Sequence, residues 1–159
     1  MNFIMKNKYL FHFAMTMLCW SVFTFSVSSQ ITTQNLGVVQ NGKITLTELQ
    51  QAERILKVGL STGAVVSDMR IEFAPLEKRY YLLGKISNDP VSGKALQLHQ
   101  NGDVLFAATG PGIEISCSGF KCSHCAPNIA GTKPKCACLE SSAGSDRYCE
   151  MFTKSTIGF

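Results

Sequence analysis

Cysteine is the residue type in this chain whose number and spacing could do chemistry. Six of its seven cysteines lie between residues 117 and 159, with the spacing C-x4-C-x2-C-x10-C-x-C-x10-C. They are Cys117, Cys122, Cys125, Cys136, Cys138 and Cys149. Thiols so close in sequence can pair as three disulfides, bind a metal ion as thiolates, or exchange disulfides with a substrate. The redox compartment in which the chain folds decides between these chemistries.

Residues 1–29 have the pattern of an export signal. Two lysines precede an uncharged apolar run, Phe13 to Val27, and small residues follow it. The run is short for a membrane span, which needs about 20 apolar residues, so we expect cleavage after Ser29, with Ser28 as the alternative. An uncleaved anchor helix is the competing interpretation. Cys19 lies inside the apolar run and is expected to be removed with it.

Export to an oxidising compartment favours three disulfides among the remaining six cysteines. The segment that holds them has few large apolar residues, and each bridge adds about 2–4 kcal/mol of stability that the segment cannot gain by burial. A bond between Cys136 and Cys138 would close a strained, very small ring and is not expected. The rest of the connectivity stays open at this stage.

Metal binding is the alternative chemistry for the same residues. Cys122-x2-Cys125 and Cys136-x-Cys138 offer four thiolates in two close pairs, a spacing that zinc can use, and His124 lies between two of them. An oxidising compartment opposes this interpretation, and two cysteines would be left over. We therefore expect no cofactor, with zinc as the alternative.

A thiol redox function is a further alternative, because Cys122-Ser123-His124-Cys125 has the C-x-x-C spacing of thiol–disulfide oxidoreductases. A catalytic pair needs a strand before it and a helix after it to lower the thiol pKa. Pro127 and Asn128 follow here almost at once, which is typical of a loop.

Upstream of the cysteines, residues 30–116 show the periodic patterns of regular structure. Thr45 and Glu48 have the spacing of a capping box, and apolar residues then recur every three or four positions, which predicts an amphipathic helix that stops near Gly63. The buried face of this helix is expected to carry Leu46, Leu49, Ala52, Leu56 and Leu60.

Alternating apolar residues predict four or five short strands after the helix. They are expected over residues 69–73, 79–86, 95–99, 103–108 and 113–117, and a further short strand is expected over residues 36–40, before the helix. Asn101-Gly102 predicts a two-residue hairpin turn flanked by Gln100 and Asp103. Sequential strands joined by short turns pair antiparallel. The predicted fold class is therefore α+β, with one helix packed on a four- to five-stranded antiparallel meander sheet, followed by a disulfide-rich, loop-dominated tail.

The predicted organisation has three parts: a signal peptide at 1–29, an α+β domain at 30–116, and a cysteine-rich tail at 117–159 packed on that domain. The tail reads Cys-Ser-Gly-x-x-Cys-Ser-x-Cys, then Cys-x-Cys and a last Cys. In this it resembles the ends of small uncharacterised secreted bacterial proteins. The resemblance implies export and a scaffold type, and it implies no activity.

Composition narrows the function classes. The formal net charge is +4 and no dense basic cluster is present, so neither nucleic acid nor an anionic membrane is indicated as a partner after signal cleavage. Five acidic residues stand at no spacing that would pair them for catalysis. These are Asp68, Glu72, Glu77, Asp89 and Asp103.

The leading hypothesis is a secreted or periplasmic, disulfide-stabilised module with a binding or structural role toward an unknown extracellular or periplasmic partner, without evident catalytic activity. The alternative is a zinc-binding or thiol redox protein that uses the C-x-x-C and C-x-C cysteines.

Overall fold

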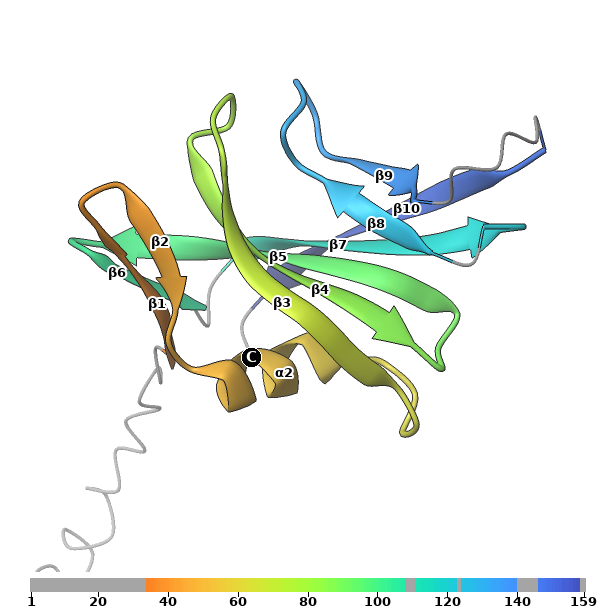
Figure 1. The fold of residues 1–159 in the computed structure, drawn as a ribbon, viewed down its shortest axis with the longest axis horizontal. Coiled ribbons are helices and arrows are strands. Elements are labelled where there is room, and N and C mark those ends of the chain that lie inside the picture. The colour runs from red at the N-terminus through yellow and green to blue at the C-terminus, as the bar shows by residue number, and fades with distance from the viewer. Residues whose placement is uncertain (1–33, 108–110, 123, 140–145, 158–159) are drawn as a thin grey trace, which may run out of the picture. The chain divides into compact units, whose positions relative to one another are not determined.

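Strands make up most of the described chain. The computed structural model describes residues 34–107, 111–122, 124–139 and 146–157; the predicted export signal at 1–29 lies outside them. The strands are β1 (Gln34–Gln40), β2 (Lys43–Leu46), β3 (Val65–Ala74), β4 (Arg79–Ser87), β5 (Val91–Asn101), β6 (Val104–Ala107), β7 (Pro111–Phe120), β8 (Cys125–Asn128), β9 (Lys135–Cys138) and β10 (Tyr148–Ile157). One helix of the described residues, α2 (Leu49–Lys57), separates β2 from β3 (Figure 1).

The predicted fold class is wrong, because the structure is mainly β. Eight antiparallel strands form one sheet. Six of them follow the order β10-β7-β5-β6-β1-β2, and β5 also pairs with β4, which in turn pairs with β3. β8 and β9 form a separate two-stranded sheet. The short strand expected over residues 36–40 corresponds to β1, but the prediction missed β2 and its pairing with β1. It also took the cysteine-rich segment for loops, although that segment supplies β8, β9 and β10.

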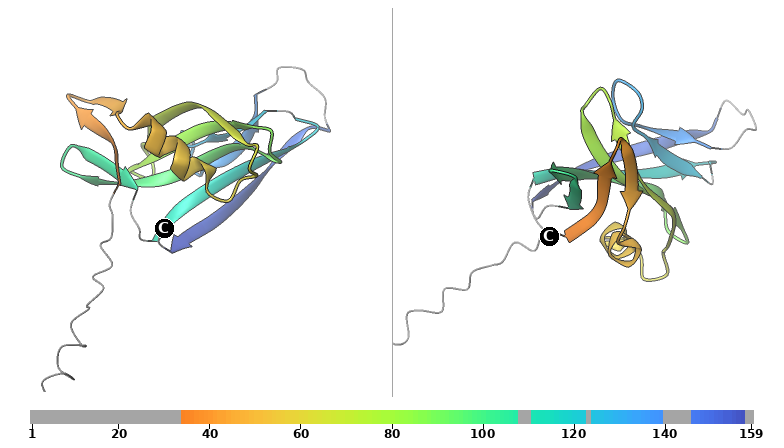
Figure 2. Two further views of the ribbon diagram at one scale, coloured as in Figure 1. Left: turned by 90° about the horizontal axis from the view of Figure 1, so that it is seen from below. Right: turned by 60° about the vertical axis from the view of Figure 1, so that its left-hand side comes forward.

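Strand β5 connects the two halves of the large sheet. Its first part pairs with β4 on one edge and with β7 on the other, while its last three residues pair with β6. The sheet curls until β2 contacts β3, and α2 packs against β1, β3 and β5 (Figure 1, Figure 2). A strongly curved sheet can wrap a short helix in this way because antiparallel strands twist and bend at bulges.

Helix α2 begins later than the capping pattern predicts. Thr45 lies in β2, and no side chain caps the helix at Glu48. The helix buries Ala52, Ile55 and Leu56, while Leu49 stands in the first turn with 57 % of its surface exposed. The expectation that Leu49 is buried was therefore wrong. The helix begins at Leu49, and its buried face is formed by residues later in the helix.

The hairpin at the predicted Asn101-Gly102 turn exists with its turn shifted by one residue. β5 continues through Asn101, which pairs with Val104, so Gly102 and Asp103 form the two-residue loop. Gly102 has a φ of 57°. That left-handed conformation strains residues with a side chain, which explains the glycine at this position.

The two faces of β4 and β5 bury two different cores, because successive strand residues point to opposite faces. The helix-side core consists of Leu36, Ala52, Ile55, Leu56, Ala64, Val66, Ile71, Leu82, Ile86, Leu96, Leu98, Leu105 and Ala107. The disulfide-side core consists of Ala74, Tyr81, Leu83, Ala95, Ile115, Cys117, Cys122, Cys125 and Ile129. The first lies against α2, and the second contains three of the cysteines.

Candidate binding site beside the disulfide cluster

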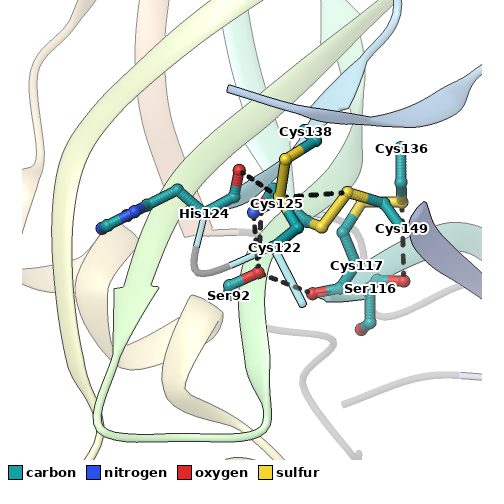
Figure 3. Close-up of a disulfide and its surroundings, with 9 residues drawn as sticks. All are labelled: Ser92, Ser116, Cys117, Cys122, His124, Cys125, Cys136, Cys138 and Cys149. Atoms are coloured by element: carbon teal, nitrogen blue, oxygen red, sulfur yellow. Dashed lines mark hydrogen bonds between the residues drawn. A yellow bond between two sulfur atoms is a disulfide. The ribbon is translucent and has the colours of Figure 1, made fainter. Parts of the chain in front are cut away.

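The six cysteines of the tail form three disulfides. Cys117 bonds to Cys136, Cys122 to Cys138, and Cys125 to Cys149, with Cα–Cα distances of 5.7, 6.0 and 5.8 Å (Figure 3). The first three cysteines thus pair in sequence order with the last three, and Cys136 and Cys138 bond to different partners. Disulfide bonding is confirmed, and the chain is a disulfide-stabilised module.

The disulfides fasten the β8–β9 hairpin to the large sheet. Cys117 on β7 bonds to Cys136 on β9, and Cys125 on β8 bonds to Cys149 on β10. Cys117 and Cys125 are almost fully buried. The hairpin is too short to be stable by itself, so these covalent links hold it in one position.

A buried serine and a glycine fix β8 against β5. Ser92 accepts a hydrogen bond from the Cys125 backbone N–H at 3.0 Å, and its hydroxyl lies 3.2 Å from the Cys125 carbonyl oxygen. At Gly93, an added Cβ would lie 2.5 Å from that same carbonyl oxygen. Any larger residue at position 93 would therefore push the hairpin away from the sheet.

The sulfur atoms that lie closest together in the structure are not those of the four cysteines predicted to bind zinc. Of Cys122, Cys125, Cys136 and Cys138, only Cys122 and Cys138 share a bond. The sulfurs of Cys122, Cys138 and Cys149 lie within 4.8 Å of one another, and the Cys149 and Cys122 sulfurs are 3.8 Å apart. Bonded sulfurs offer no thiolate, so this cluster could bind a metal ion only after reduction.

A cavity of about 260 Å³ lies between β3–β4 and the β8–β9 hairpin. Its charged and polar lining consists of Asp68, Arg70, Glu72, Lys85, Ser92, His124 and Asn128. Its apolar lining consists of Leu83, Gly84, Ala126, Pro127, Ala137 and Leu139 together with Cys125. The disulfide-fixed hairpin is therefore one wall of a cavity with a mixed polar and apolar lining, and the sheet is the other wall.

Strand β3 has a bulge where it meets the cavity. The register with β4 shifts between Ser67 and Arg70, and Asp68 has a φ of 49°. A left-handed conformation is uncommon outside glycine and often occurs at functional sites. The bulge turns Asp68 out of the regular alternation, so both it and Arg70 line the cavity.

The charges at the cavity are only partly paired with one another. Arg70 forms an ion pair with Glu72 at 2.5 Å, and its Nη1 donates to the Asp68 carbonyl oxygen at 3.4 Å. Within the described residues, neither the half-buried Lys85 ammonium nor the Asp68 carboxylate has an ion-pair or hydrogen-bond partner. The cavity thus offers one cation and one anion to a ligand.

Sequence reasoning identified only part of this site. Asp68 and Glu72 are visible in the sequence as carboxylates at no pairing distance from one another, and both line the cavity. Arg70 and Lys85 do not stand out in the sequence, because each takes the place of a polar residue in an alternating strand. The available signal in the sequence was the pair of opposite charges, Asp68 and Arg70, at the point where the alternation of β3 breaks.

No protein-family model, curated protein or solved structure matches the chain. In the part of the chain that the structure describes, no helix has the length and apolar character needed to cross a membrane. The function has to be argued from the chemistry of the site itself.

Proposed function

We propose that this chain is an exported, disulfide-stabilised binding module whose ligand occupies the cavity between β3–β4 and β8–β9. The observation that carries the proposal is a pair of groups of opposite charge, Lys85 and Asp68, on one cavity of about 260 Å³, neither of which has a partner among the described residues. Small-molecule sites combine an apolar lining with a few convergent polar groups, as this cavity does.

The ligand class follows from the lining. A carboxylate on the ligand would pair with Lys85, an ammonium would pair with Asp68, and Leu83 and Pro127 would contact the carbon skeleton. At about 260 Å³ the cavity is slightly smaller than most ligand sites, which have volumes of about 300–1,000 Å³. A small zwitterion, such as an amino acid or a dipeptide, meets these requirements best.

Rigidity supports binding at this position. The hairpin wall is fixed by three disulfides and by the Ser92 contacts, so a ligand would not have to order it. Binding to a preorganised wall avoids much of the entropy cost that weakens sites on mobile loops.

The proposed location is the secreted or periplasmic space. Disulfides persist in oxidising compartments and are rare in the cytosol, and the lysine-led apolar run at the N-terminus has the pattern of an export signal. N-terminal sequencing of exported protein tests this proposal. A first residue at Gln30 or Ser29 is expected, and a mature chain that retains Cys19 would contradict it.

The binding test is a two-dimensional amide NMR titration of the oxidised protein with a panel of free amino acids and dipeptides. At least one of them should shift amide signals along the cavity lining. Lys85→Met should weaken that binding about tenfold or more, because the ligand carboxylate loses its charged partner. Lys43→Met, on an exposed lysine of β2, is the matched control and should leave affinity unchanged. Equal binding by both variants, or no shift with any compound, would refute this site.

A second candidate function, thiol-dependent metal binding, is favoured by one observation: the three sulfurs of Cys122, Cys138 and Cys149 lie within 4.8 Å of one another. After reduction they could give zinc three thiolates and leave a fourth position open. Elemental analysis and a thiol count on protein purified from its native compartment separate the two candidates. Stoichiometric zinc with four or more free thiols would favour the metal function over the disulfide-fixed binding site.

A further inference from the structure

Strand β10 is an open edge of the large sheet. It lies at one end of the strand order, and β7 is its one strand partner among the described residues (Figure 2). Every described side chain from Glu150 to Ser155 is exposed. The outer backbone N–H and C=O groups of such a strand can form a ladder with another strand, and proteins usually shorten or cover edges of this length.

One face of this edge is aromatic. Tyr148 stacks on Phe120 of β7 with ring centroids 5.2 Å apart, and Phe152 lies on the same face because it stands four residues further along the strand. Phe152 is 55 % exposed, and Phe120 and Tyr148 are each 50 % exposed. Exposed aromatic residues on an open edge strand are typical of association surfaces.

Two charges flank Phe152 symmetrically. Glu150 lies two residues before it and Lys154 two residues after it, so all three side chains share a face. Neither charged side chain has an ion-pair partner within the described residues. Glu114, which stands opposite Lys154 on β7, is already engaged by Lys94 at 3.0 Å.

Symmetry restricts how two copies of this strand could pair. A twofold axis between antiparallel strands places one residue opposite its own copy, and residues equally far from it then face each other. Centring on Glu150 or Lys154 would put like charges opposite. Centring on Met151 or Thr153 would put a charge opposite an aromatic ring. Centring on Phe152 puts each Glu150 opposite a Lys154, so the strand is complementary to itself in that register.

We propose that β10 pairs antiparallel with β10 of a second copy of this chain, with Phe152 opposite Phe152 and two Glu150–Lys154 pairs across the interface. The two sheets then continue through the interface, and the open edge is covered. This assignment does not depend on the ligand cavity, which lies between β3–β4 and the β8–β9 hairpin.

The experiment is sedimentation velocity on the full mature chain at several protein concentrations and at low ionic strength. The wild type should shift from monomer to dimer as concentration rises. Lys154→Glu places two glutamates opposite each other, and Glu150→Lys places two lysines opposite each other, so each variant alone should remain monomeric. Both positions are exposed, and the thermal unfolding midpoints should match the wild type.

Mixing the two variants gives the decisive measurement. The Lys154→Glu copy carries only acidic residues at positions 150 and 154, and the Glu150→Lys copy only basic ones, so the mixture should form a heterodimer. Lys43→Glu, on the strand at the opposite end of the sheet order, is the control and should dimerise like the wild type. A wild type that stays monomeric at every concentration would overturn the proposal, as would single variants that dimerise normally or a mixture that does not associate.

Discussion

The helix-side core and the disulfide-side core share β4 and β5 but are stabilised by different means. The helix-side core is built from aliphatic residues, and α2 adds Ile55 and Leu56 to it without any cysteine. The disulfide-side core has fewer large side chains, chiefly Tyr81, Leu83 and Ile115, and contains three cysteines. One face of the sheet is thus stabilised by burial of apolar area, and the other also by covalent restriction of the unfolded chain.

This contrast shows that disulfides can hold a short hairpin on a sheet when the hairpin has little apolar area to bury. α2 brings its own apolar face, while β8 and β9 have little to bury and are joined to β7 and β10 by disulfides. The two sides should therefore respond differently to reductant and to core substitutions.

Complete reduction should have the largest effect on the disulfide side. Removing one native bridge from a small domain costs about 2–5 kcal/mol, so loss of all three should release the β8–β9 hairpin. Hydrogen exchange followed by mass spectrometry should show lost protection over 125–138, with protection of 49–57 retained. Equal loss of protection in both segments would show that the two cores unfold as one unit.

Lys94→Met should cause the largest loss from a single substitution, about 3–5 kcal/mol, because it leaves the carboxylate of Glu114, whose side chain is 14 % exposed, without its partner. Lys94 has a side chain only 3 % exposed, pairs with Glu114 at 3.0 Å, and also donates to the Val58 carbonyl oxygen at 2.6 Å. Chemical denaturation measures the loss. Adding Glu114→Gln should recover part of it, and a single variant as stable as the wild type would contradict a structural role for the pair.

Leu56→Ala and Leu83→Ala form a matched pair, one in each core, and each should cost about 2–5 kcal/mol in the oxidised protein. The cost of Leu83→Ala should fall after reduction, because the hairpin beside Leu83 is then already released. The cost of Leu56→Ala should stay the same. Urea unfolding of both variants with and without reductant gives the four values, and equal changes in the two would argue against separate cores.

Tyr81→Phe should have the smallest effect, about 1 kcal/mol at neutral pH, through loss of the 2.5 Å hydrogen bond from the Tyr81 hydroxyl to Glu77. Burial, with Glu77 nearby, raises the pKa of Tyr81 to about 12. The unfolded chain loses this proton near pH 10, so stability should fall as pH rises from about 10 to about 12. Thermal unfolding across that range should show a smaller fall in Tyr81→Phe than in the wild type, because the other tyrosines and the lysines also titrate there, and equal falls in the two proteins would assign the effect to those groups.

The sequence predicted the parts of this fold that follow from local pattern. Alternation located β3, β4 and much of β5, because each has a regularly buried face. The same reasoning could not find β8, β9 or β10. Cys125–Asn128 and Lys135–Cys138 show no apolar alternation, since disulfides hold them, and β10 is an exposed edge.

The candidate site depends on structural features that the periodicity of apolar residues in the sequence does not reveal. The bulge that brings Asp68 to the cavity is a one-residue change of register, and it is specified by pairing with β4. Lys85 lines a cavity only because the β8–β9 hairpin forms the other wall. The disulfide connectivity that holds the hairpin there cannot be derived from the cysteine spacing alone.

The order of the three disulfides has a consequence for survival among proteases. The segment between Cys125 and Cys136 is spanned by all three bridges, because the first three cysteines lie before it and their partners lie after it. A protease that cuts the chain anywhere in this segment leaves two fragments joined by three covalent bonds. The cut molecule keeps its mass, apart from one added water, until every bridge is reduced. Where proteases are present, the lifetime of the molecule as one particle is then set by reductants more than by the continuity of its backbone.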